Sequence, residues 1–139
     1  MSVRLRLRLT AIALFGLLTA CAGESQRAQT ASDSGIDIAG IIIRNSLDYS
    51  VKNVIVQVPA TGRFAGCGNI HPRTECKTSF PAIGYRKNGL LVTWLEQGEA
   101  KATDEFVVEP PAGSKPGDSL WLEVVIYSAG LAGARLVQP

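Results

Sequence analysis

Beyond residue 35 the apolar side chains recur with a period of two, which predicts strands; no stretch there shows a sustained helical period. The clearest alternation covers 119–128, with one set of side chains on each face. Two earlier runs, over 36–43 and 54–58, show strand signals too, and Pro59 ends the second. The two faces of the 119–128 run carry Leu120, Leu122, Val124 and Ile126 on one side, and Trp121, Glu123, Val125 and Tyr127 on the other.

Turn signals divide these runs. Asn88-Gly89 suits the positive φ angles of a type I′ turn and predicts a hairpin of strands over 83–87 and 90–95. Gln97-Gly98 predicts a second turn before a strand over 102–109, and 110–118 (PPAGSKPGD) predicts a long loop. The stretch 66–77 has no alternation and is expected to be irregular.

About seven short strands in some 100 residues predict an all-β fold, a small antiparallel β-sandwich formed by residues 36–139 as a single domain. At the level of fold this layout resembles immunoglobulin-like or transthyretin-like bacterial domains, with an up-and-down barrel as the alternative. A fold of this kind is shared by proteins of many functions, so the resemblance does not indicate one.

Residues 1–20 have the pattern of an export signal. Arg4, Arg6 and Arg8 precede the apolar run Thr10–Leu18, which is too short to form a stable membrane-spanning helix. The run ends in Leu18-Thr19-Ala20-Cys21, which resembles the lipobox of bacterial lipoproteins. The alternative is an ordinary secretory signal with Cys21 nearby by chance.

The lipoprotein resemblance implies that residues 1–20 are a cleaved signal peptide and that Cys21 carries the lipid. Two or three acyl chains anchor a protein stably in a membrane, whereas one does not. Ala22 after the cysteine favours the outer membrane, facing the periplasm, by analogy with lipoprotein sorting. Residues 21–35 contain no Val, Leu, Ile or aromatic residue and predict a flexible tether with ends about 20 Å apart.

The charges exclude a generally basic nucleic-acid binder. Three of the fourteen Lys and Arg residues lie in the leader, so eleven basic residues face twelve acidic ones after cleavage, a formal charge of −1. Between residues 63 and 87, however, five basic residues face Glu75 alone. These predict an anion-binding patch, to which Phe64 and Tyr85 would add aromatic contacts: Arg63, Arg73, Lys77, Arg86 and Lys87.

The other two cysteines predict a disulfide. Cys67 and Cys76 form an even pair in a chain with an export signal, and their cross-link would stabilise an otherwise loose stretch. The alternatives are a redox-active pair, or a metal site that adds His71. A closed zinc site needs a fourth ligand, for which the sequence offers no further Cys or His, so we expect no metal or other cofactor.

The sequence offers little for catalysis, because His71 is the only histidine and no nucleophile motif appears. The favoured hypothesis is a non-catalytic, lipid-anchored envelope protein that acts as an accessory or protein-interaction module. Its partners would be the membrane, through the lipid on Cys21, and an envelope protein. The alternative is an envelope lipoprotein that binds a small ligand or a metal.

The first test concerns the anchor. In cells fed a clickable fatty acid, the wild-type chain should be labelled and Cys21→Ala should not, because the thioether forms on that sulfur. A gel that resolves the labelled band is sufficient. Labelling of the variant at the wild-type level would remove the lipoprotein assignment.

Overall fold

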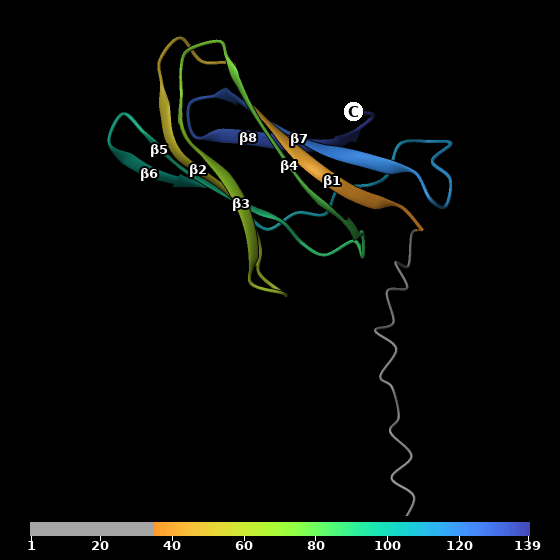
Figure 1. Ribbon diagram of the computed structural model, residues 1–139. Helices are drawn as coiled ribbons and strands as arrows, with labels where there is room; N and C mark the ends of the chain where they lie inside the picture. Colours follow the sequence, from red (N-terminus) through yellow and green to blue (C-terminus); the bar gives the residue numbers. More distant parts are fainter. Residues whose placement is uncertain (1–34) are drawn as a thin grey trace, which may run out of the picture.

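The computed structural model describes residues 35–139, which form two four-stranded sheets and contain no helix that could cross a membrane (Figure 1). Sheet A has the order β4 (Glu75–Gly84), β1 (Asp37–Asn45), β7 (Ser119–Ser128) and β8 (Leu131–Val137). Sheet B has the order β3 (Arg63–Ile70), β2 (Val51–Val58), β5 (Leu91–Glu96) and β6 (Glu99–Ala102).

This arrangement confirms the all-β sandwich and differs from the barrel alternative, because the two sheets are separate. The expected signal peptide, Cys21 and the expected tether up to residue 34 lie outside the described residues. Neighbouring strands are antiparallel except β1 and β7, which are parallel, so sheet A is mixed. The first strand lies between the fourth and the seventh, unlike the immunoglobulin order in which it pairs with the second. Of the two expected likenesses, the transthyretin-like one is therefore closer.

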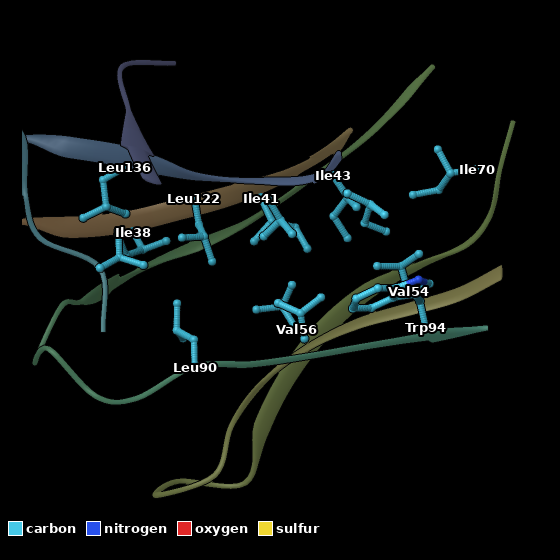
Figure 2. Close-up of a cluster of buried hydrophobic side chains, with 14 of the residues drawn as sticks. Ile38, Ile41, Ile43, Val54, Val56, Ile70, Leu90, Trp94, Leu122 and Leu136 are labelled. Carbon is cyan, nitrogen blue, oxygen red and sulfur yellow. The ribbon is translucent and has the colours of Figure 1, made fainter. Parts of the chain in front are cut away.

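The core lies between the sheets, where apolar side chains from both point toward one another (Figure 2). The predicted two-faced alternation of β7 is confirmed, and the face with Leu120, Val124 and Ile126 is the inner one, where these three side chains are fully buried. In β1 a register shift between Ile38 and Gly40 changes the alternation, so side chains at even and then odd positions face inward. Each fully buried aliphatic side chain contributes about 1.5–3 kcal/mol of transfer free energy.

Of the two predicted turns, one forms and one does not. Gln97 and Gly98 both have positive φ, 51° and 86°, and join β5 to β6 as expected. The Asn88-Gly89 hairpin is wrong: β4 pairs with β1 and β5 pairs with β2, so residues 85–90 cross between the sheets. Tyr85 holds this crossing in place, since its backbone N–H donates to the Ile36 carbonyl at 3.0 Å and its hydroxyl donates to the Val108 carbonyl.

The strand expected over 102–109 is also displaced. The strand occurs earlier, as β6. In the rest of the predicted range, 103–109, the pairing is limited to an isolated bridge between Phe106 and Leu90. Thr103 still contacts Val92: its backbone N–H donates to the Val92 carbonyl at 2.9 Å, and its side-chain hydroxyl oxygen accepts the Val92 N–H at 3.1 Å. From there the chain crosses to sheet A through the predicted loop 110–118, which forms no strand.

The stretch expected to be irregular, 66–77, instead contributes to β3 and β4, which are joined by a short turn at 71–74. The predicted disulfide between Cys67 and Cys76 is present, and its Cα atoms are 6.4 Å apart. Because β3 is an edge strand of sheet B and β4 an edge strand of sheet A, the cross-link joins the two sheets along one side of the sandwich.

Removal of this cross-link should destabilise the fold. The chain-entropy model gives about 2.7 kcal/mol for a loop of this length. We therefore expect Cys67→Ser combined with Cys76→Ser to lower the free energy of unfolding by about that amount in urea titrations. The wild type should shift similarly in reductant, whereas the double variant should not respond to it. Equal midpoints for the wild type with and without reductant would contradict a structural disulfide.

Candidate functional site

The disulfide decides what the Cys67, His71 and Cys76 set can do. Each sulfur is bonded to the other, so neither is a thiolate that could bind a metal in this state. His71 is exposed in the turn after β3, and its carbonyl accepts hydrogen bonds from Asn45 and Thr74. Within residues 35–139 no three His, Cys, Asp or Glu side chains are grouped so as to hold a metal ion.

The five basic residues of the predicted patch do not form one cluster. Arg63 begins β3, whereas Arg73 follows its other end, and a strand of eight residues spans roughly 26 Å. Tyr85 is buried and cannot add an aromatic contact at the surface, although Phe64 is exposed. Acidic side chains already pair with several of them: Arg73 with Asp48 at 3.2 Å, Lys77 with Glu75 at 2.9 Å, and Lys87 with Glu109 at 2.8 Å. Anion binding by these residues stays a prediction.

One end of the sandwich is closed by Asn45, the fully buried last residue of β1. Its amide nitrogen lies 2.7, 3.2 and 3.1 Å from the carbonyl oxygens of Tyr49, Ile70 and His71. Its side-chain oxygen accepts the Leu47 N–H at 3.0 Å. A single side chain thus holds the β1–β2 connection against the β3–β4 turn.

At the same end Glu96, buried at the close of β5, accepts three hydrogen bonds. They come from the Tyr49 hydroxyl at 2.8 Å, the Trp94 indole N–H at 2.9 Å and the Gly130 N–H at 3.0 Å. Burial alone would raise the pKa of Glu96, but the hydrogen bonds from Trp94, Gly130 and Tyr49 favour the carboxylate and lower it below its usual value. This carboxylate therefore joins turns of both sheets and has a structural role.

The outer face of sheet B, which we call the uncharged face, is the first candidate surface. Register places the exposed Ile55 between Gly66 of β3 and Thr93 of β5, and places Phe64 opposite Gln57. Phe64 is 75% exposed and Ile55 37%. One charged side chain, Lys52, occurs among the outward positions that the strand pairing assigns, which are Lys52, Ile55, Gln57, Phe64, Gly66, Asn69, Leu91, Thr93, Leu95, Ala100 and Ala102.

The outer face of sheet A is the second candidate surface and is charged. Its centre is Glu123 of β7, a buried carboxylate between Arg44 at 3.1 Å and Arg135 at 2.5 Å. Arg44 also contacts Glu75 at 3.0 Å, and Glu75 contacts Lys77 at 2.9 Å. These five side chains form a ladder of ion pairs, the charge ladder, across all four strands. The hydrogen bond from Lys77, followed by the charges of Lys77 and Arg44, lowers the pKa of Glu75 despite some desolvation.

Sequence reasoning placed Glu123 on the strand face opposite Leu122 and Val124 but missed the ladder. Arg44 ends an isoleucine run and Arg135 lies among small residues, so neither has a local motif. A signal was present in Glu123 itself, because a charge in the middle of an otherwise apolar strand needs a partner if it is buried. The partners are set by strand order, which the sequence did not reveal.

Comparison with known proteins adds little. No family model and no curated protein matches this chain. A protein from Eubacterium rectale, solved by NMR, is similar in structure with a TM-score of 0.42 and 14% sequence identity, over 73% of this chain and 87% of that one. This similarity is too low to indicate a shared family or function.

The Glu96 cluster gives a test with a pH dependence. Because the folded pKa of Glu96 is lowered, its contribution is complete above the unfolded pKa and is lost as pH falls through the folded value. Glu96→Gln should lower the free energy of unfolding by about 1–3 kcal/mol at neutral pH. That difference should shrink below about pH 4 in urea titrations. A difference that stays constant down to about pH 2 would show that ionisation of Glu96 is irrelevant.

Proposed function

We propose that this protein is a non-catalytic module of the bacterial envelope, anchored by a lipid on Cys21, and that it binds another envelope protein through the uncharged face of sheet B. The observation that carries the proposal is the composition of that face. Contiguous exposed apolar surface on a soluble domain marks an interaction site more often than chance, and charged residues are depleted at the centres of protein interfaces.

The uncharged face fits a protein partner in detail. Phe64 stands out from the edge strand β3, with Gly66 two residues along the same face. A Cβ at Gly66 would lie 2.3 Å from the Val54 carbonyl oxygen, so this position must remain bare. A protruding aromatic ring beside a bare backbone and the flanking Ile55 is the kind of anchor that supplies much of the affinity at an interface.

Two features support an envelope location. The lipobox resemblance is the first. The second is the cross-link between Cys67 and Cys76, since disulfides persist in oxidising compartments such as the periplasm and are rare in the cytosol. The described domain begins with β1, whose start lies at the opposite end of that strand from Asn45 and its polar cluster. A tether attached there leaves the outer faces of both sheets open.

Site-specific photo-crosslinking in intact cells tests the proposal. A photoreactive residue at Phe64 should give one discrete protein adduct, and the same residue at the exposed Ala112 in the 110–118 loop should not. Ile55→Glu should abolish the Phe64 adduct, because it places a charge in the contact, whereas Ala112→Glu should leave it intact.

Thermal melts of both glutamate variants would establish that they fold. Absence of an adduct at Phe64, identical adducts at both positions, or insensitivity to Ile55→Glu would each refute the contact. Loss of the Phe64 adduct in Cys21→Ala, with the melt unchanged, would show in addition that the partner is met at the membrane.

A further inference from the structure

Two aromatic side chains lie on the outer face of sheet A, both on β7 and both leaning onto a glycine of the neighbouring strand. A Cβ at Gly40 of β1 would be 2.9 and 3.0 Å from two atoms of the Trp121 benzo ring. A Cβ at Gly133 of β8 would be 3.6 Å from a ring atom of Tyr127. An edge of each ring therefore reaches over the strand next to β7.

Both rings remain open to solvent on one side. Trp121 is half-buried and Tyr127 is 55% exposed. They are six residues apart on one strand and share a face, so the two rings are about 20 Å apart along β7. A shallow, open depression of about 320 Å³ lies on the same face beside Val125, Gly133 and Arg135.

The charge ladder crosses the strip between the rings. Arg44 and Arg135 are 48% and 73% exposed, so N–H groups of both reach solvent while Glu123 fixes the positions of their guanidinium groups. Lys77 and Glu75 extend the row. Along β7, an aromatic ring on the β1 side is thus followed by a row of fixed hydrogen-bond donors and acceptors and then by a second aromatic ring on the β8 side.

We propose that this strip binds a linear glycan chain that crosses β7 obliquely, with one sugar ring stacked on Trp121 at the β1 side and another on Tyr127 at the β8 side. A pyranose presents a face of C–H groups, which carry slight positive charge and suit the negative face of an aromatic ring. Its hydroxyl groups lie around the rim, where arginine donors and glutamate acceptors can meet them. A glycan chain offers both kinds of contact along its length: C–H faces that can stack on the two separated rings, and hydroxyl groups that can bind the polar side chains between them.

Other polymers fit this surface less well. A protein partner would meet five charged groups at the centre of its contact, where protein interfaces are depleted of charge. A single-stranded nucleic acid also stacks on aromatic rings, but it needs a strongly positive groove for its phosphates. The ladder has three cations against two anions, a net charge of only +1.

Co-sedimentation of the full chain in detergent with protein-free peptidoglycan sacculi, chitin or cellulose tests the inference and separates the sources of glycan. The wild type should pellet with at least one of the three. Trp121→Ala should weaken binding by about tenfold, the loss expected for one stacked ring, and Tyr127→Ala should weaken it similarly. Val107→Ala is the control, an exposed apolar residue outside the strands of both sheets, and should bind like the wild type.

Intrinsic fluorescence provides a readout without any variant that might fail to fold. Trp94 is buried and its indole N–H donates a hydrogen bond to Glu96, so acrylamide should quench mainly the fluorescence of Trp121. Soluble oligosaccharides of the polymer that sediments should protect that fraction from quenching. The inference is overturned if none of the three polymers binds, if both alanine variants bind like the wild type, or if the oligosaccharide leaves quenching unchanged. Loss of binding at about 0.5 M NaCl would overturn it too, because that indicates ionic attraction rather than stacking.

This inference does not depend on the protein contact proposed for sheet B. A chain that loses its Phe64 adduct but still sediments with a glycan would retain the sheet A site, and the converse result would retain the sheet B contact. The two proposals can therefore fail separately.

Discussion

The buried amide of Asn45 is the interaction on which the arrangement of the two sheets depends. It ends β1 and fixes the chain as it leaves sheet A for sheet B, and it holds that connection to the turn by which β3 leads back to β4. A buried amide that lacks hydrogen bonds destabilises the fold. The connection and the turn must therefore present their carbonyl and N–H groups to Asn45. Within the described residues every buried side-chain polar atom has a partner, which is the same constraint applied throughout.

The two outer faces of the sandwich can differ in composition because the turns are held from inside, by the polar cluster of Asn45 and Glu96. Glu96 and Asn45 hold the turns together from inside, so neither outer face is needed for that purpose. One face is nearly without charge and the other is crossed by a ladder of five charged groups. Such a division is what the two proposed contacts require, because each needs an outer face of different chemistry.

Periodicity in the sequence was sufficient for the fold class and for the two faces of β7, and turn residues were sufficient for the turn at Gln97-Gly98. It failed where side chains carry no apolar signal. β3 and β4 contain Gly66, Gly68 and a run of polar residues, and β8 contains small residues such as Ala132 and Gly133, so none shows clean alternation. These strands are specified by their neighbours, through pairing and the cross-link between the sheets.

The error at Asn88-Gly89 has a similar cause. The dipeptide permits a tight turn, but a hairpin also requires that the flanking segments pair with each other. Here Tyr85 is held by Ile36 and Val108, which directs the chain across to the other sheet instead. The charge ladder could not be predicted for the same reason, because Arg44 and Glu123 are 79 residues apart and meet only through the strand order.

The parallel pairing of β1 with β7 has a consequence for how the domain acquires its structure. Asp37 lies beside Ser119, and the pairing continues to Asn45 beside Ile126, so the first strand lacks one neighbour until most of the chain is available. Contacts between such distant segments make folding slow, in the range of milliseconds to seconds for all-β domains of this size. A nascent or translocating chain must therefore keep Ile41 and Ile43 soluble until residue 126 arrives, and the opening strand is among the last to be fully paired.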